Sequence, residues 1–298
     1  MEEPARPRGG RHGHRSALGR WVLVLAGWTC LATDPTAAEA QEIQWEPLGE
    51  GLAITLWEPG DRCEDEVPSS VILKVDPGRV RFATYHFLDE GLPEPPAIRD
   101  WQRRTGASVV VNSGLFLEDY SYLGILLKDG RSIGGKRHPT WQGLFVAEPV
   151  QPGLRKAGIL DLSVDHFSSE RPAYREAAQS LMLLDRKGKL RVRRSGRQAD
   201  QTVVGENGDG TILLIKTTAA VGLRELAECL RVGLPELRQA MALDGGSSSD
   251  LIIAPDLRRR FEGERDPPAW QGFVDGSGRP HIPLPSVIGV FPRSAEAH

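Results

Sequence analysis

The sequence predicts a single α/β domain, of the α+β kind, with a mixed, largely antiparallel β-sheet and few helices. Most of the chain consists of short apolar or alternating runs separated by turn residues, which is the pattern of strands and hairpins. Only the stretch from Leu223 to Leu230 places apolar residues at a clear helical spacing. With 298 residues, of which 40% are hydrophobic, the chain can build one sizeable core.

Turn and breaker residues separate the expected elements. Pro77 and Gly78 form the turn between a pair of strands, and Asp129-Gly130 turns a hairpin. Helices are expected at 97–105, stopped by Gly106, and from Leu223 onward, ended by Gly233 and Pro235. Strands are expected at 42–57, 71–75, 80–86, 107–111, 123–127, 131–133, 144–147, 160–167, 177–185, 211–216, 240–243, 251–253 and 287–291.

The first forty residues have the pattern of a secretory signal peptide. Several arginines precede an apolar stretch at 21–32, and Ala38-Glu-Ala40 fits a cleavage site of small residues. The apolar stretch is short for a membrane helix, so no stable span is expected after cleavage, with an uncleaved anchor as the alternative. The mature protein is expected to be secreted or periplasmic. The predicted organisation is a signal at 1–40, an N-terminal β segment at 41–69, the main domain at 70–292 and a tail at 293–298.

Charge and cysteine content narrow the classes of function. A formal net charge of −3 gives no general attraction to nucleic acid, so no nucleic-acid partner is expected. Cleavage of the signal would remove Cys30 and leave Cys63 and Cys229. These two either form a disulfide in an oxidising compartment or stay as buried thiols. Two cysteines without a group of histidines do not make a zinc site.

The loop after the apolar run at 240–243 is the strongest candidate for a functional site, because it combines a carboxylate with glycines and hydroxyl groups. Asp244 ends this run, and small residues follow it: Gly245, Gly246, Ser247, Ser248 and Ser249. Glycines let a ligand approach their backbone N–H groups, and hydroxyls add neutral donors. Such a loop suits an anionic, oxygen-rich ligand. The alternative is a structural hairpin turn capped by Asp244.

Two other polar residues end predicted strands. The apolar run at 107–111 leads to Asn112, whose amide can contact a ligand at the strand end or bond the turn backbone at Ser113-Gly114. His86 ends the strand at 80–86. An imidazole titrates near neutral pH, so His86 is a candidate general acid or phosphate ligand, with a structural role as the alternative.

The loop at Asp244 and the strand end at Asn112 resemble two motifs of the phosphodiester glycosidase family. Leu243-Asp-Gly-Gly-Ser-Ser-Ser-Asp-Leu251 is similar to the family's Leu-Asp-Gly-Gly-Gly-Ser-Ser-Thr-Leu. Val109-Val-Val-Asn-Ser-Gly-Leu-Phe116 is similar to its apolar strand ending in Asn-Ala/Gly-Gly-Phe-Phe. The resemblance extends over residues 70–292 and implies the family's fold. It also places Asn112, Gly114 and the loop from Asp244 in the active site.

Two further segments match the family pattern less completely. Gln179-Ser180 is similar to the family's Gln-Ser/Ala-Gly-Pro, with Leu181-Met182 in place of Gly-Pro. Gln201-Thr-Val-Val-Gly205 resembles its Arg-Thr-Ala-Val-Gly, with Gln201 in place of Arg. The resemblance therefore adds three candidate ligand contacts: Gln179, Thr202 and Gly205. Arg197 is a candidate to replace the charge lost at Gln201.

The activity that the resemblance implies is that of an exported glycosidase, which splits the sugar-phosphate bond of a sugar-1-phosphodiester. The transition state resembles an oxocarbenium ion, and Asp244 is expected to stabilise or attack it. The departing phosphomonoester carries oxygens of low pKa, so the site needs donors that hold phosphate more than a strong general acid. The expected donors are the N–H groups of Gly245 and Gly246, the hydroxyls of Ser248 and Ser249, and the side chains of Asn112 and Thr202.

Two other classes of function stay open. A non-catalytic envelope glycan-binding protein of the same fold fits the departures at Gln201, Leu181-Met182 and Ser247. A metal-dependent phosphodiesterase could hold a hard divalent cation on Asp244 and Asp250, although no histidine lies near them in the sequence. No other cofactor is expected. A serine hydrolase does not fit, because the loop lacks the closing Gly of a nucleophile elbow.

Overall fold

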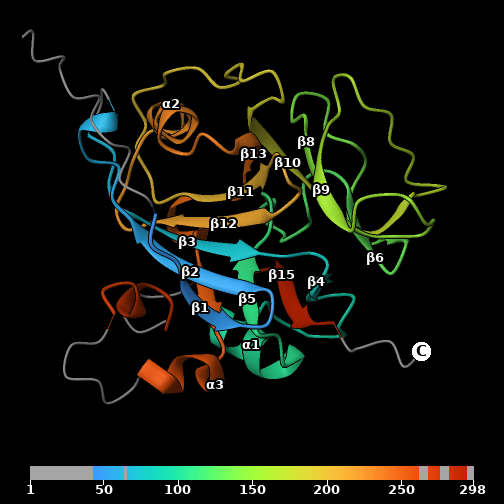
Figure 1. Ribbon diagram of the computed structural model, residues 1–298. Coiled ribbons are helices and arrows are strands. Elements are labelled where there is room, and N and C mark those ends of the chain that lie inside the picture. Colours follow the sequence, from blue (N-terminus) through green and yellow to red (C-terminus); the bar gives the residue numbers. More distant parts are fainter. Residues whose placement is uncertain (1–42, 64–65, 262–267, 276–281, 294–298) are drawn as a thin grey trace, which may run out of the picture. The chain divides into compact units, whose positions relative to one another are not determined.

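The fold consists of two antiparallel sheets that pack face to face (Figure 1). The computed structural model of the chain describes residues 43–63, 66–261, 268–275 and 282–293. They form one compact unit. The predicted signal at 1–40 lies outside the described residues, as does most of the predicted tail.

The larger sheet has eleven strands and takes them from both halves of the chain. In order across the sheet they are β1 (Glu46–Gly49), β2 (Leu52–Trp57), β3 (Ser70–Val75), β12 (Ile212–Thr217), β11 (Thr202–Asn207), β13 (Leu237–Ala242), β10 (Tyr174–Leu184), β6 (Leu126–Lys128) and β7 (Arg131–Ser132). Two more, β8 (Gly143–Pro149) and β9 (Ala157–Asp161), branch from β10. β1 and β2 come from the expected N-terminal segment, and β2 pairs with β3, so this segment continues the large sheet.

The smaller sheet has four strands, in the order β14 (Leu251–Ile253), β5 (Val109–Asn112), β15 (Ser286–Pro292) and β4 (Val80–His86). All the strand pairs described in the two sheets are antiparallel. The predicted class, with mostly antiparallel strands and few helices, is confirmed. The expected single mixed sheet is instead two sheets. The parallel strands β12 and β13 do not pair with each other, because β11 lies between them and pairs antiparallel with both.

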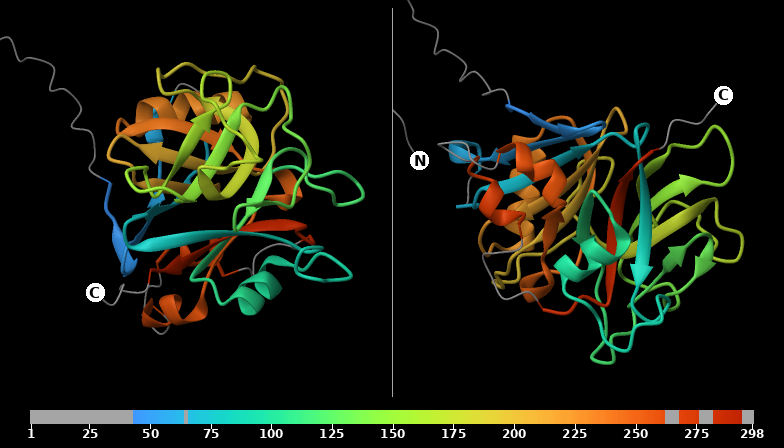
Figure 2. Two further views of the ribbon diagram at one scale, coloured as in Figure 1. Left: turned by 90° about the vertical axis from the view of Figure 1, so that its right-hand side faces the viewer. Right: turned by 90° about the horizontal axis from the view of Figure 1, so that it is seen from below.

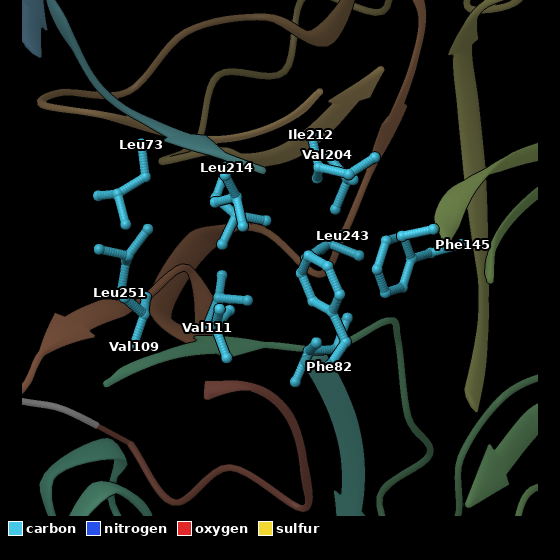
Figure 3. Packing of buried hydrophobic residues seen from close by; sticks show 14 of the residues in the cluster. Leu73, Phe82, Val109, Val111, Phe145, Val204, Ile212, Leu214, Leu243 and Leu251 are labelled. Carbon is cyan, nitrogen blue, oxygen red and sulfur yellow. The ribbon is translucent and has the colours of Figure 1, made fainter. Parts of the chain in front are cut away.

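Apolar side chains from both sheets meet in the main core (Figure 3). Leu73, Val204 and Leu214 come from the large sheet, and Val111 and Leu251 come from the small one. Successive strand residues point to opposite faces, so each sheet presents one row of apolar side chains to this core. All four residues of β5 are buried, in agreement with the continuous apolar run seen in the sequence.

Helices cover the outer faces of the two sheets. α2 (Leu223–Gly233) packs on β10 and β13 and buries the apolar stripe predicted from its spacing. α1 (Ile98–Thr105) packs on the small sheet through Trp101, and the left-handed Gly106 ends it as predicted. The left view of Figure 2 shows β4 and β15 between α1 and the large sheet. The remaining short helices are η1 (Gly60–Arg62), η2 (Gly246–Ser248), α3 (Pro255–Arg258), η3 (Arg259–Phe261) and η4 (Gln271–Phe273).

One predicted strand is misplaced. The sequence suggested a strand at 160–167, whereas β9 ends at Asp161. The Asp161 carboxylate accepts hydrogen bonds from the N–H and the hydroxyl of Ser163, at 2.9 and 2.6 Å, and so closes a turn there. The pattern of apolar residues does not show that a side chain can hydrogen-bond nearby backbone and so end the strand.

A disulfide joins Cys63 to Cys229, so the structure chooses between the two states that the sequence left open. Their Cα atoms are 5.0 Å apart, and 166 residues separate them in the sequence. The bond connects the segment after η1 to α2. Among the described residues, no helix is long and apolar enough to cross a membrane.

The chain passes directly from one sheet to the other after β13. β13 ends in the large sheet at Ala242, and β14 begins in the small sheet at Leu251. The stretch between them carries Asp244 and its glycines and serines. β5 also lies in the small sheet, next to β14, so its end at Asn112 faces this passage. The fold therefore brings the two sequence motifs to one edge of the main core.

Candidate active site

The ends of β5 and β13 lie side by side, as the sequence led us to expect. The Asn112 side-chain amide donates to the backbone oxygen of Asp244 at 2.8 Å. The backbone N–H of Asp244 donates to the backbone oxygen of Ser113 at 3.0 Å. Leu243, just before Asp244, is buried in the main core (Figure 3). An acidic side chain is thus held at the edge of an apolar core.

Of the two roles that the sequence left open for Asn112, the structure shows hydrogen bonding to backbone groups. Its side-chain oxygen accepts the N–H of Asp250 at 3.0 Å, and its amide group also donates to the Ser113 oxygen at 3.1 Å. The residue is only 1% exposed. Because these bonds join both ends of the 244–250 loop to β5, Asn112 positions the loop and its amide is not presented to a ligand.

Asp244 is the half-buried carboxyl group of the site. Its Oδ1 accepts the N–H of Gly245 at 3.1 Å, and the Ser248 hydroxyl also hydrogen-bonds to the carboxylate. Burial raises the pKa of Asp244, and the bonds from Ser248 and Gly245 oppose that rise. A carboxylate needs several donors to satisfy its lone pairs, so these two bonds leave Asp244 acceptor capacity for a ligand.

The structure explains both glycines of the loop, Gly246 by its positive φ and Gly245 by a close approach to a neighbouring side chain. The N–H of Gly246 donates to the Asp200 oxygen at 2.8 Å, and Gly246 has a φ of +68°. A Cβ on Gly245 would lie 2.9 Å from the Gln201 side-chain oxygen. Since the N–H of Gly245 bonds Asp244, both N–H groups expected to hold phosphate are occupied by the protein itself.

The hydroxyl groups of the loop point in several directions. Ser247 is exposed at the tip, whereas Ser248 is buried and bonds Asp244. The hydroxyls of Ser249 and Thr202 are 2.8 Å apart and bond each other in a buried position. Thr202 begins β11, so this bond holds the loop against the large sheet. Thr202 therefore lies beside the Asp244 loop, and the contact with a ligand that the resemblance implied stays a prediction.

Tyr122 is a buried residue of the site that the sequence reasoning missed. Its hydroxyl donates to the backbone oxygen of Gln179 at 2.8 Å and accepts the N–H of Gly114 at 3.2 Å. Burial raises the pKa of Tyr122 far above its ordinary value, and the negative charge of Asp244 contributes to this rise. A Cβ on Gly114 would lie 2.3 Å from this hydroxyl, which explains the glycine. No periodic signal marked Tyr122, because it lies in an irregular segment.

Gln179 holds a segment of backbone and does not present its amide to a ligand. Its side-chain oxygen accepts the N–H groups of Ile125 and His138, at 3.0 and 2.9 Å. Its amide nitrogen donates to the oxygens of His138 and Trp141, at 2.9 and 2.6 Å. These four bonds use the full capacity of the side chain. Gln179 therefore fixes the 124–141 segment beside the site.

Three other candidates lie away from the Asp244 loop or face other groups. Gly205 lies within β11, where a Cβ would meet the Leu237 side chain at 2.7 Å, so its role is packing. His86 is buried, its Nε2 lies 3.1 Å from the Tyr120 oxygen, and burial lowers its pKa. Arg197 is exposed, and its N–H donates to the Ser195 hydroxyl at 3.3 Å. The structure provides no contact between these residues and Asp244 within the stretches of chain that it describes.

Lys216 is the second residue that the sequence reasoning missed. It lies in β12 directly opposite Thr202 and is only 8% exposed. Burial lowers the pKa of Lys216, and the negative charge of Asp250 opposes this effect. A lysine at the end of the otherwise apolar run at 212–216 was the available signal. In the described ranges, no three or more His, Cys, Asp or Glu residues cluster as metal ligands would.

Comparisons with known proteins agree with the motifs. The family model described as phosphodiester glycosidase matches residues 105–291. The catalytic domain of zebrafish N-acetylglucosamine-1-phosphodiester alpha-N-acetylglucosaminidase, in a form auto-inhibited by its pro-peptide, has a similar structure. It has 15% sequence identity and a TM-score of 0.55, over 85% of this chain and 88% of that one. A hypothetical protein from Synechocystis has 11% identity and a TM-score of 0.54, over 86% of this chain and 65% of that one. No curated protein sequence matches the chain.

Proposed function

Because the chain belongs to the phosphodiester glycosidase family, we propose that it hydrolyses the sugar-phosphate bond of a sugar-1-phosphodiester. The products are a free sugar and a phosphomonoester. Water adds across the bond between the anomeric carbon and the phosphate oxygen, and the phosphate leaves with the electron pair. The zebrafish enzyme has a name that describes this kind of bond, but its identity of 15% supports the fold alone.

The observation that carries the proposal is the position of Asp244. Its carboxyl group is half-buried at the meeting point of the two sheets and has acceptor capacity left. In its ionised form it can stabilise the positive charge that develops on the sugar, or attack the anomeric carbon. A partly desolvated carboxylate interacts more strongly with such a charge than one in water, because water screens less there.

The direct test compares the wild type with Asp244→Asn on a sugar-1-phosphate ester of nitrophenol. Cleavage at the sugar releases reducing sugar and nitrophenyl phosphate, whereas a phosphodiesterase releases coloured nitrophenol. The substitution keeps the shape of the side chain and removes its charge, so we expect kcat/KM for sugar release to fall by roughly 10²–10⁴-fold. Asp256→Asn, on an exposed carboxylate of α3, is the matched control and should leave the rate unchanged.

The pH profile of kcat/KM gives a second reading of the same residue. The ionised form of Asp244 is the active one, and its raised pKa means that ionisation requires a higher pH than for an unperturbed Asp. The rate of sugar release should therefore fall with decreasing pH earlier than for an unperturbed Asp. If a folded Asp244→Asn variant released sugar at the wild-type rate, Asp244 would not take part in the reaction.

We also propose that the protein acts outside the cytoplasm. The sequence pattern at 1–40 supports this, and so does the disulfide between Cys63 and Cys229, since such bonds persist in oxidising compartments. The substrate would then be an envelope or extracellular glycan with a phosphodiester link. Fractionation of cells that express the full chain, with N-terminal sequencing of the mature protein, tests the location.

Non-catalytic binding of a glycan is the second candidate, and one observation favours it. The N–H groups of Gly245 and Gly246 already have partners in the protein, so the loop has fewer donors for phosphate than its composition suggests. On this alternative, the wild type would bind the nitrophenyl sugar phosphodiester without releasing sugar. Repeating the assay with a chelator separates both readings from a metal-dependent phosphodiesterase, whose nitrophenol release would stop.

A further inference from the structure

Lys216 places an ammonium group on the inner face of the large sheet. Within the sheet, Lys216 pairs with Thr202 of β11 on one side and with Val71 of β3 on the other. Residues two apart in a strand share a face, so Lys216 lies on the same side as Ile212 and Leu214. These two residues belong to the main core between the sheets. Lys216 thus extends from the edge of that core.

The ammonium of Lys216 has no hydrogen-bond or ion-pair partner among the described residues. The residue is 8% exposed. Lys128 in β6, by contrast, forms ion pairs with Asp89 and Glu90. The charge of Asp250 acts on Lys216 from a distance and does not form a contact. A largely desolvated ammonium that lacks a protein partner is stabilised by an anion that reaches it from solvent, so the position has the character of a binding site for an anion.

The neighbours of Lys216 are the residues that hold the Asp244 loop. Thr202, directly opposite, bonds the Ser249 hydroxyl at 2.8 Å. Asp250, whose negative charge interacts with Lys216, donates its backbone N–H to the side-chain oxygen of Asn112 at 3.0 Å. The long apolar stem of a lysine can pack against core residues while its charged end reaches the polar edge. For Lys216, that polar edge is the end of the 244–250 loop that contains Ser249 and Asp250.

We propose that Lys216 binds the phosphoryl group of the substrate. This inference rests on the proposed function, because it takes the ligand to be a sugar phosphodiester. Arg197, the cation that the sequence suggested for this role, is exposed and does not contact the loop. Position 201, next to Thr202, is a glutamine whose amide donates to the Val221 oxygen at 3.1 Å. Lys216 therefore supplies, from the neighbouring strand, the positive charge that position 201 lacks.

Binding of inorganic phosphate tests the inference without any need for turnover. Isothermal titration of the wild type, Lys216→Met and Lys216→Arg with inorganic phosphate measures the contribution of the charge. A charge-assisted hydrogen bond contributes about 1.5–3 kcal/mol, so Lys216→Met should weaken binding by roughly 10- to 100-fold. Lys216→Arg keeps the charge and should bind phosphate much more tightly than Lys216→Met.

The matched control is Lys74→Met. Lys74 also lies in the large sheet, but it pairs with Leu213 and its ammonium lies 5.6 Å from the centre of the Trp45 ring. Leu213 belongs to the cluster under α2, so Lys74 is on the opposite face from the site. The control removes a lysine charge from the same sheet and should leave phosphate affinity unchanged.

Lys216→Met removes a positive charge that interacts with Asp250, so a second variant guards against a loss of folding. The double variant Lys216→Met/Asp250→Asn removes both charges and keeps their sum. Removal of an acid favours anion binding, so weaker phosphate binding in the double variant still traces to Lys216. A folded Lys216→Met or double variant with wild-type phosphate affinity would overturn the inference, as would a wild type that does not bind phosphate. A wild type that binds phosphate but releases no sugar would overturn the proposed function instead.

Discussion

At the scale of single residues, the site depends on buried side chains that hold backbone in place. Tyr122 shows this most clearly, because its hydroxyl connects Gly114 after β5 to Gln179 in β10. It is 4% exposed and contributes no charge at neutral pH. Asn112 acts in the same way on the other side of Asp244. Both residues hold the backbone around Asp244 in place.

Tyr122→Phe should therefore destabilise the fold by about 1–3 kcal/mol, because it leaves the Gly114 N–H and the Gln179 oxygen buried without a partner. The change is measured as the shift in the urea midpoint at constant slope. Tyr120→Phe is the control, since Tyr120 is exposed. Equal midpoints for the two variants would show that the Tyr122 hydroxyl contributes nothing.

At the scale of elements, one side chain holds an irregular segment against a strand. Gln179 in β10 makes four hydrogen bonds to backbone groups of Ile125, His138 and Trp141. The segment from 133 to 142 has few strand contacts of its own, because β7 ends at Ser132 and β8 begins at Gly143. Its order next to the site therefore depends on Gln179.

Gln179→Ala should release this segment locally. Amide hydrogen exchange at Ile125 and His138 should become faster, by roughly 10-fold or more, because each N–H loses its acceptor and local opening becomes easier. Exchange measured by mass spectrometry or NMR checks this. Gln102→Ala, which removes a glutamine from the distant α1, should leave both amides protected. Unchanged exchange in Gln179→Ala would mean that other contacts order the segment.

At the scale of the whole molecule, the chain is connected across long distances. The passage from β13 to β14 links the two sheets, and the disulfide between Cys63 and Cys229 closes a loop with a separation of 166 residues. Cys229 is buried in α2, so the disulfide also ties the N-terminal strands of the large sheet to the helix that covers it. Such a bond stabilises the fold mainly by restricting the unfolded chain.

Reduction of the disulfide, or the double variant Cys63→Ser/Cys229→Ser, should lower the free energy of unfolding by roughly 2–5 kcal/mol. Urea unfolding of the wild-type protein with and without reductant measures this. The double Ser variant should unfold at the same midpoint in both conditions, which controls for other effects of the reductant. A wild-type midpoint that does not respond to complete reduction would contradict the stabilising role.

Local patterns in the sequence predicted most elements and the core of the site. The apolar runs before Asn112 and Asp244 are strands: β5 ends at Asn112, and β13 ends at Ala242, two residues before Asp244. Gly106 stops α1 as expected. Alternation and helical spacing depend on near neighbours, so a single sequence is enough to read them. The strand at 160–167 was wrong because the Asp161 side chain ends the ladder, which periodicity does not show.

The sequence by itself determined the chemical groups available to this protein: an acid, small residues and hydroxyls at one strand end, and an amide at another. Only the tertiary structure decided how they are used. It placed Asn112 beside Asp244 across 132 residues, turned both loop N–H groups inward, and brought Lys216 opposite Thr202. These outcomes depend on which strands pair and in what register, and pairing between distant segments is fixed by the packing of the whole core.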